Sequence, residues 1–138
     1  MDESKIVDKL IKLSKKAMSK GDVPVGAIIV ENNKVIASSY NKKFYRNDST
    51  AHAEILCIKS ACKKKKTTYL NDCIMYVSLE PCMMCSSAII QSHIKKVIFL
   101  LKSPKYGYLS KNITNIEYEE RYNEKYETIL KGFFKDKR

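Results

Sequence analysis

The strongest constraint on the fold of this chain is the alternation of short apolar runs with helix-like segments in its second half. Residues 74–79 read Ile-Met-Tyr-Val-Ser-Leu, which is typical of a buried strand, and residues 97–101 form a second such run. Between them the sequence favours a helix that starts near Pro81 or Cys82 and ends near Ser92. Strand, helix and strand in this order predict parallel neighbouring strands with the helix packed on the sheet.

The N-terminal segment predicts an amphipathic helix. Apolar residues recur with helical spacing from about residue 4 to residue 20, and lysines fill the other face. Asp2 and Glu3 suit the helix start and Gly21 suits its end. A basic amphipathic helix can lie on a membrane, but we expect its apolar face to pack on the core.

The remaining segments predict a hairpin and two more helices. Residues 25–30 and 34–39 are rich in apolar and β-branched side chains and flank an Asn-rich connection, as in a hairpin. Residues 48–50 (Asp-Ser-Thr) offer caps for a helix over about 51–62, and a last helix is expected over about 117–134. The order helix, hairpin, helix, strand, helix, strand, helix indicates an α/β sheet that starts antiparallel and continues with parallel pairs.

Length and charge limit the class of protein. A chain of 138 residues with 44% hydrophobic residues predicts one domain spanning 1–138, and it excludes a wholly disordered chain. No apolar run is long enough to span a bilayer, and the N-terminus lacks the apolar core of a signal peptide, so we expect no membrane association and a cytoplasmic protein. The net charge of +11 favours a polyanionic partner, although lysines on solvated faces need no partner.

Two of the five cysteines are spaced for metal or redox chemistry. An odd number of cysteines in an intracellular chain argues against a disulfide scaffold. Cys82 and Cys85 stand at i and i+3, so the start of a helix places both sulfurs on one face, where the helix dipole favours thiolates. We expect the other cysteines to be small core residues: Cys57, Cys62 and Cys73.

A second short motif completes a candidate metal centre. His52 lies near a predicted helix start and offers a third ligand beside Cys82 and Cys85. Three protein ligands with one open position are typical of catalytic zinc, whereas four ligands are typical of structural zinc. Glu54 is not needed as a ligand, and its carboxylate can accept a proton from an attacking water and return it to a leaving group.

Each motif also has a simpler interpretation. His52 alone is more often a structural histidine, and Glu54 alone is more often a charge that complements a helix dipole. The cysteine pair alone is compatible with a redox motif or with half of a structural zinc site completed by His93 or Cys57. The joint pattern of His-x-Glu followed by Pro-Cys-x-x-Cys makes these separate interpretations much less favoured, because it is the signature of zinc-dependent nucleobase deaminases.

The chain resembles the bacterial tRNA-specific adenosine deaminases of the cytidine deaminase-like superfamily, and the resemblance covers essentially its whole length. The matching segments are 23–27 (Val-Pro-Val-Gly-Ala), Asn41, 48–55 (Asp-Ser-Thr-Ala-His-Ala-Glu-Ile), 76–85 (Tyr-Val-Ser-Leu-Glu-Pro-Cys-Met-Met-Cys), 88–90 (Ala-Ile-Ile) and the pair at 133–134 (Phe-Phe). The resemblance implies a three-layer fold with helices on both faces of a mixed sheet.

The resemblance also implies an activity, a cofactor and partners. The activity is hydrolytic conversion of adenosine to inosine at the wobble position of a tRNA anticodon, with loss of ammonia, by a homodimer that contacts the anticodon stem-loop. One zinc ion per subunit would be bound by three ligands and served by a proton-transferring glutamate: His52, Cys82, Cys85 and, for the proton, Glu54. Backbone N–H groups of Ala53 and Cys82 would lie near the attacking oxygen, Asn41 would hydrogen-bond the purine, and Val25 would wall the pocket.

Departures from the family pattern concern RNA contacts rather than the zinc chemistry. Ser103 stands at a usually acidic position and Lys43 at a position that is often Pro. A deaminase of a free base, nucleoside or nucleotide, of the guanine or cytosine type, would need the same zinc site; a non-enzymatic zinc-stabilised RNA-binding subunit would not need Glu54. Basic stretches favour RNA: residues 63–66, 95–96 and 102 with 105.

Overall fold

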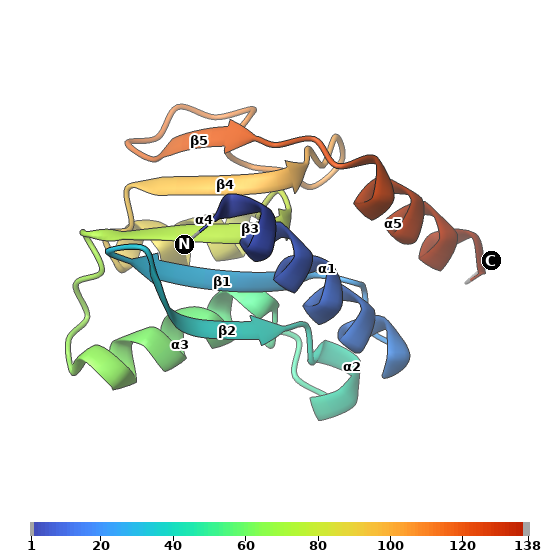
Figure 1. Ribbon diagram of the computed structural model, residues 1–138, viewed down its shortest axis with the longest axis horizontal. Helices are drawn as coiled ribbons and strands as arrows, with labels where there is room; N and C mark the ends of the chain where they lie inside the picture. The colour runs from blue at the N-terminus through green and yellow to red at the C-terminus, as the bar shows by residue number, and fades with distance from the viewer. Residues whose placement is uncertain (1, 137–138) are drawn as a thin grey trace.

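The computed structural model describes residues 2–136, which form a five-stranded mixed sheet with helices on both faces (Figure 1). The elements in chain order are α1 (Glu3–Ser19), β1 (Gly26–Glu31), β2 (Lys34–Tyr40), α2 (Lys43–Arg46), α3 (Ala53–Lys65), β3 (Cys73–Leu79), α4 (Met83–Gln91), β4 (Lys96–Leu101), β5 (Glu117–Glu120) and α5 (Glu124–Asp136). The strand order is β2-β1-β3-β4-β5, with β1 antiparallel to both neighbours and β3, β4 and β5 parallel. The predicted three-layer α/β fold is confirmed.

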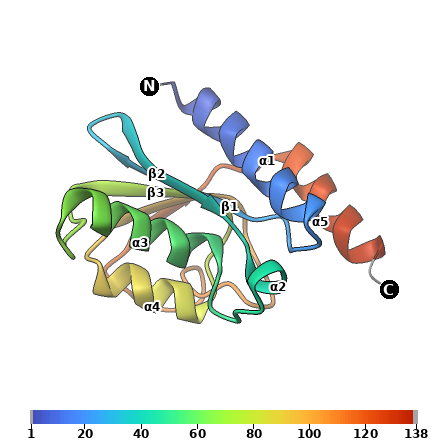
Figure 2. The same cartoon turned by 90° about the horizontal axis from the view of Figure 1, so that it is seen from below.

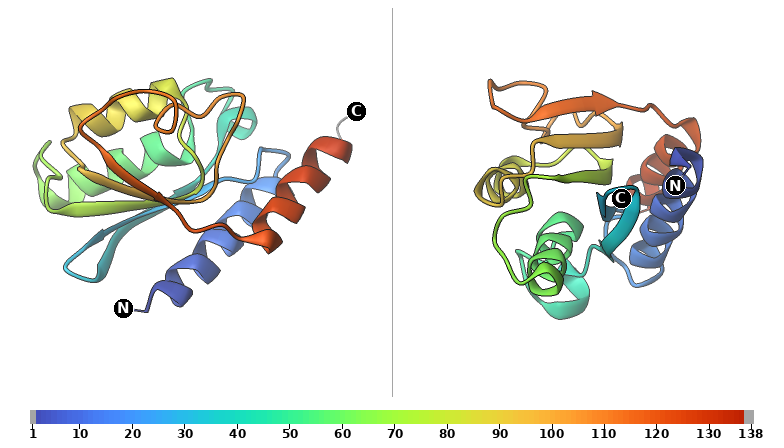
Figure 3. Two further views of the ribbon diagram at one scale, coloured as in Figure 1. Left: turned by 90° about the horizontal axis from the view of Figure 1, so that it is seen from above. Right: turned by 60° about the vertical axis from the view of Figure 1, so that its left-hand side comes forward.

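The helices divide into two layers. Figure 2 shows α1 and α5 side by side on one face of the sheet and α3 and α4 on the other, and Figure 3 shows the same arrangement from two further directions. Among the described residues, no helix combines the length and the apolar character needed to cross a membrane.

The central strands are buried on both faces, which explains their continuous apolar runs. In β3, Met75 and Val77 belong to the core under α3 and α4, whereas Tyr76 belongs to the core under α1 and α5. In β4 the same alternation assigns Phe99 to the first core and Ile98 to the second. A one-residue shift of register would exchange these two sets, so the sequence specifies the pairing strongly.

The α1 helix lies unusually close to the sheet. Its expected start is confirmed, because the Asp2 side chain accepts the Ser4 N–H at 3.1 Å. On the buried face the hydroxyl groups of Ser14 and Ser78 are 2.6 Å apart. A Cβ atom on Gly26 would come within 2.6 Å of Leu13 Cβ, so the absence of a side chain at residue 26 permits this close approach.

The predicted hairpin is confirmed. Asn32 and Asn33 connect β1 to β2, and both have positive φ, of 51° and 62°. Consecutive residues with positive φ are characteristic of a turn whose twist matches that of paired strands, and Asn tolerates this conformation better than most residues.

The expected last helix is wrong over its first residues. Residues 117–120 form the edge strand β5, parallel to β4, and α5 begins only at Glu124. The Glu-Tyr-Glu-Glu sequence of β5 has no buried face to reveal a strand, and its pairing depends on backbone hydrogen bonds and on flanking ion pairs such as Lys96 with Glu117, at 3.2 Å. Charged side chains on an edge strand also discourage pairing with other chains. The short helix α2 was not predicted either.

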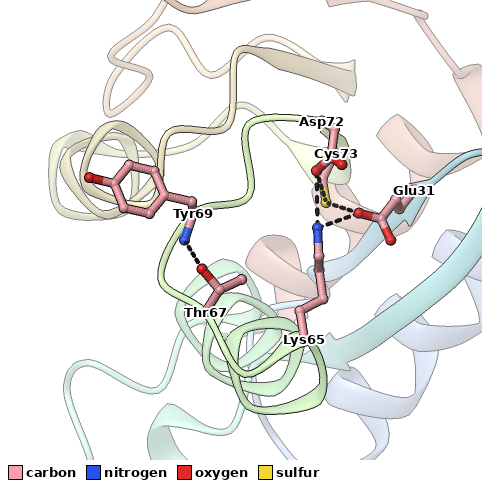
Figure 4. A network of polar contacts seen from close by, with 6 residues as sticks. All are labelled: Glu31, Lys65, Thr67, Tyr69, Asp72 and Cys73. Atoms are coloured by element: carbon pink, nitrogen blue, oxygen red, sulfur yellow. Dashed lines mark hydrogen bonds and ion pairs between the residues drawn. The ribbon is translucent and has the colours of Figure 1, made fainter.

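A polar network fixes one end of α3 to the sheet (Figure 4). Lys65 forms ion pairs with Glu31 of β1 and with Asp72, the latter at 3.0 Å, and Cys73 lies beside both carboxylates. Nearby, the Tyr69 N–H donates to Thr67 Oγ1. Although Glu31, Asp72 and Cys73 are close enough to suggest a cation site, the Lys65 ammonium group already supplies their positive charge.

The opposite end of the sheet collects the connections that carry the predicted motifs. Because β1 is antiparallel to β2 and β3, its first residues pair with the last residues of those strands, as in Gly26 with Tyr40 and Ala27 with Val77. β4 ends at the same end of the sheet, since Leu79 pairs with Leu101. We call this end of the sheet the strand-exit end. Ligand sites of α/β sheets commonly lie at such an end.

Candidate active site and metal centre

Two helix starts bring together the three predicted metal ligands. His52 is the N-cap residue of α3, Cys82 is the N-cap residue of α4, and Cys85 follows in the first turn of α4. His52 Nδ1 lies 3.9 Å from Cys82 Sγ and 3.5 Å from Cys85 Sγ. All three donor atoms lie within 4.8 Å of one another. The structure therefore confirms their convergence, and their role as ligands remains a prediction.

The donor set and its spacing fit a tetrahedral metal ion. With a metal–sulfur bond of roughly 2.3 Å and a metal–nitrogen bond of roughly 2.0 Å, ligand sulfur and nitrogen atoms at the tetrahedral angle stand roughly 3.5 Å apart. The separation of 3.5 Å between His52 Nδ1 and Cys85 Sγ matches this value, and that of 3.9 Å to Cys82 Sγ is slightly longer. One imidazole nitrogen and two cysteine sulfurs leave the fourth tetrahedral position to a small molecule, as in catalytic rather than structural sites.

Electrostatics favour a thiolate in this cluster. The pKa of Cys82 is lowered to about 4 because Cys85 and His52 hydrogen-bond its sulfur, against the opposing effect of burial. The same pairing and burial raise the pKa of Cys85. The pKa of His52 is raised, chiefly by its hydrogen bond to Cys82. A metal ion that binds here would displace the protons shared among these groups and would be bound by the stabilised thiolate.

Glu54 is a buried carboxyl group beside the candidate metal ligands. The residue is 4% exposed and belongs to the lining of a cavity of about 490 Å³ that also reaches His52 and Cys82. Burial raises the pKa of Glu54 to about 7. A carboxyl group with a pKa near neutrality can both accept and donate a proton, as general acid–base catalysis requires.

The cavity lies at the strand-exit end and includes most of the predicted site residues. Its lining comprises Asp22, Val23, Val25, Asn41, Lys43, Phe44, His52, Glu54, Leu79, Glu80, Cys82, Ser103 and Tyr106. Val25 precedes β1 and Asn41 follows β2, so the hairpin supplies one wall. Cys85 and Ala53 are fully buried behind the lining.

Asn41 and Ala53 are joined in a way that the sequence did not predict. The Ala53 N–H donates to Asn41 Oδ1 at 2.7 Å, and its expected place near the attacking oxygen stays a prediction. The expected caps at 48–50 are wrong, because the Asp48 side chain binds Thr50, at 2.9 Å from its N–H, and no side chain of this segment caps α3. With Oδ1 engaged, the Asn41 Nδ2 group makes no hydrogen bond within residues 2–136 and is available to the cavity.

Sequence reasoning missed two buried carboxylates in the cavity wall, Asp22 and Glu80. Asp22 is fully buried, and its Oδ2 atom accepts the N–H groups of Phe44 at 3.0 Å and Tyr45 at 3.4 Å at the start of α2. Glu80 binds the segment after β4 in a similar manner. Their positions immediately before Val-Pro and Pro-Cys were the available signal, because motif edges often carry side chains that hold the motif in place.

Positive charge gathers beside the part of the cavity lined by Lys43 and Phe44. The pKa of Lys42 is lowered by partial burial and by the nearby positive charges of Arg46, Lys16 and Lys20. Lys43 belongs to the lining itself. Exposed aromatic side chains alternate with these lysines: Lys43 lies over Phe44, Lys20 over Tyr45, and Lys105 over Tyr106.

The lysine run at the end of α3 and the pair at the start of β4 lie elsewhere. The last residues of α3 and the first residues of β4 lie at the end of the sheet opposite the strand-exit end. Of the basic stretches noted in the sequence, only Lys102 and Lys105 are therefore near the cavity.

Comparisons with known proteins agree with this geometry. The model of the MafB19-like deaminase family matches residues 1–138. The tRNA-specific adenosine deaminase of Bacillus subtilis is 43% identical over 86% of this chain and 73% of its own length. That of Aquifex aeolicus is 50% identical over 68% of this chain, and the chain spans 62% of its length.

A solved structure supports the same assignment. It comes from work on A-to-I editing by tRNA:A34 deaminases at the wobble position of transfer RNA, and it has a TM-score of 0.81 and 29% identity over 87% of this chain and 99% of its own. The fold, the convergent motifs and these similarities show that the chain belongs to the MafB19-like deaminase family and, within it, to the tRNA-specific adenosine deaminases.

Proposed function

We propose that this protein is a zinc-dependent deaminase that converts the wobble adenosine of a tRNA anticodon to inosine. The observation that carries the proposal is the convergence of His52, Cys82 and Cys85 beside Glu54 in one cavity. Zinc is the ion that best suits one imidazole and two thiolates in tetrahedral geometry. When bound there, zinc supplies an activated water at neutral pH.

The residues of the chain supply positioning and proton transfer. His52, Cys82 and Cys85 would hold the ion. The Glu54 carboxylate would take a proton from the attacking water and deliver it to the purine ring nitrogen. It would then take the remaining proton from the hydroxyl group added at C6 and pass it to the amino group, which leaves as ammonia. The Nδ2 group of Asn41 would donate to the purine, because its Oδ1 atom is held by Ala53.

The charge at the cavity mouth supports an RNA substrate. Lysines that alternate with exposed aromatic side chains suit an anticodon loop, whose phosphates need cations and whose unstacked bases need flat partners. A free base would need neither. We propose a cytoplasmic location, with which a tRNA substrate is compatible.

The expected homodimer and single-domain organisation belong to the same proposal. Met83 and Ile90 on α4 are 66% and 44% exposed, and these apolar side chains suit contact with a second copy of the chain. The two hydrophobic cores pack against the two faces of the same sheet, which supports one domain over residues 1–138.

The decisive experiment measures inosine in a tRNA that carries adenosine at the wobble position, with Glu54→Ala as the control. We expect inosine with the native protein and none with the variant, which should keep its fold and its zinc because the ligands remain. Failure of the folded, zinc-loaded native protein to form inosine would contradict the proposal, and turnover of a free base or nucleoside would then favour the alternative deaminase. Full turnover by Glu54→Ala would remove Glu54 from its role.

A further inference from the structure

We infer that Glu80 is a positioning residue that holds residues 102–110 in place as a wall of the substrate pocket. The expected effect on kinetics rests on the proposed function. The contacts that Glu80 makes do not depend on it. Ser103 and Tyr106 of this segment belong to the cavity lining, and Glu80 lies two residues before the expected ligand Cys82. Glu80 therefore links the metal-binding turn to the opposite wall.

Both oxygen atoms of the Glu80 carboxylate accept hydrogen bonds from the backbone. It is 3% exposed, its Oε1 atom accepts the Ser103 N–H at 3.1 Å, and its Oε2 atom accepts the Ser110 N–H at 2.7 Å. The ion pairs recorded within residues 2–136 do not include Glu80. Hydrogen bonds to an ionised acceptor are about twice as strong as neutral ones. Both oxygens hold backbone donors of residues 102–110, so these contacts place the effect of Glu80 on this segment.

Backbone hydrogen bonds tie the same two segments together. The Glu80 N–H donates to the Leu101 carbonyl at 2.9 Å, and the Tyr108 N–H donates to the Pro81 carbonyl at 3.0 Å. The carboxylate thus extends a contact that begins where β3 and β4 end. The segment that follows β4, residues 102–110, has no helix or strand of its own.

Gly107 shows how closely the segment is fitted around the carboxylate. A Cβ atom at this position would lie 2.2 Å from Glu80 Oε1 and 2.5 Å from the Ser103 carbonyl oxygen. Contacts this short are not tolerated, and the carbonyl is backbone that cannot rotate away. Glycine at 107 therefore allows the segment to wrap Glu80, and any side chain there would push the wall away from the turn.

Two independent variants test the inference. Glu80→Gln keeps the size of the side chain, but its amide NH₂ group would face one of the two backbone N–H donors, so only one of them is satisfied. Gly107→Ala leaves the carboxylate intact and disturbs the same contact by bulk. Gly132→Ala on α5 is the matched control, because nothing lies within 4 Å of a Cβ atom at that position.

For both variants we expect KM for the tRNA substrate to rise roughly tenfold, with kcat changed less than about twofold. In Glu80→Gln this is roughly the size expected for one unsatisfied buried donor, and in Gly107→Ala it results from displacement of the wall. Zinc content should remain that of the native protein. Amide hydrogen exchange of Ser103 and Ser110 should accelerate, with no change in α3. Gly132→Ala should match the native protein in each measurement.

The outcomes separate this inference from the proposed function. Unchanged exchange at residues 102–110 in Glu80→Gln would overturn the inference, whatever the substrate is. Loss of zinc with unchanged exchange would overturn it too, because Glu80 would then act on the turn alone. Faster exchange with native KM and kcat would show that the segment does not wall the pocket. If the native protein does not edit tRNA but the exchange result holds, only the proposed function fails.

Discussion

The backbone N–H of Ala53 donates to Asn41 Oδ1 at 2.7 Å, which joins the loop after β2 to the first residue of α3. The bond satisfies one of the free donors at the start of the helix, a task that a neighbouring Ser, Thr or Asp usually performs. His52 can therefore occupy the N-cap position with its ring directed to the cysteines. One contact thus helps to position His52, orients Asn41 and sets the start of α3.

Asn41 consequently has two separable roles, and two substitutions distinguish them. Asn41→Asp retains an acceptor for Ala53 but replaces the Nδ2 donor, so we expect near-native stability and a fall in kcat/KM of roughly 10- to 100-fold. Asn41→Ala removes both groups and should also cost about 1 kcal/mol of stability. Thermal unfolding and steady-state kinetics on tRNA measure the two effects. Equal stability losses in both variants would contradict the division of roles.

The cysteine ligands predict a link between metal content and stability. Cys82→Ala should lose most of its zinc and unfold at a lower temperature, because binding to the folded state alone stabilises that state. Removing zinc from the native protein with a chelator should lower the unfolding temperature in the same direction. Cys62→Ala, on α3 and outside the cavity lining, is the control and should keep its zinc. Native zinc occupancy in Cys82→Ala would exclude it as a ligand.

The close packing of α1 predicts a specific stability defect. In Gly26→Ala the new methyl group would meet Leu13 Cβ at 2.6 Å and the Leu10 carbonyl oxygen at 3.1 Å. Overpacking of this kind costs roughly 1–3 kcal/mol. Chemical denaturation should show the loss in Gly26→Ala and none in Gly132→Ala, where the added methyl group meets no atom. An unchanged unfolding midpoint in Gly26→Ala would mean that α1 moves away from the sheet at little cost.

Elements with a strong local signal were predictable, and those that depend on distant partners were not. The strands β3 and β4 are mostly apolar because both of their faces are buried. The strand β5 carries no such signal, because its Glu-rich sequence is ordered by pairing with β4. A four-residue helix such as α2 is too short for periodicity to show, and its start depends on Asp22, far from it in sequence.

The candidate site divides in the same way. The convergence of His52, Cys82 and Cys85, with Glu54 in the same cavity, was predictable because the two motifs match a known signature of metal and proton chemistry. The positioning contacts were not, since the bond between Asn41 and Ala53 and the bonds to Glu80 exist only once separate strands end at a common edge. Local spacing reveals the chemistry, whereas tertiary structure determines which side chains hold it in place.

The distribution of lysines predicts where RNA binds. Phosphate contacts release counterions, so the affinity for tRNA should fall steeply with salt, with a slope that reports the number of contacts. Lys43 and Lys105 lie at the cavity mouth, whereas Lys63 and Lys64 are exposed at the far end of α3. Both pairs remove the same charge when changed to Ala, so the net charge of +11 falls equally.

We expect Lys43→Ala with Lys105→Ala to weaken tRNA binding and to lower the slope of log affinity against log salt by about one to two. Lys63→Ala with Lys64→Ala should leave the slope near its native value, because these residues lie away from the cavity. Binding measured by fluorescence anisotropy over a range of salt concentrations tests both variants. Equal slopes for the two double variants would show that the net charge of the chain, rather than the mouth of the cavity, attracts the RNA. A native slope near zero would instead favour a small-molecule substrate, since a free base has no phosphates to neutralise.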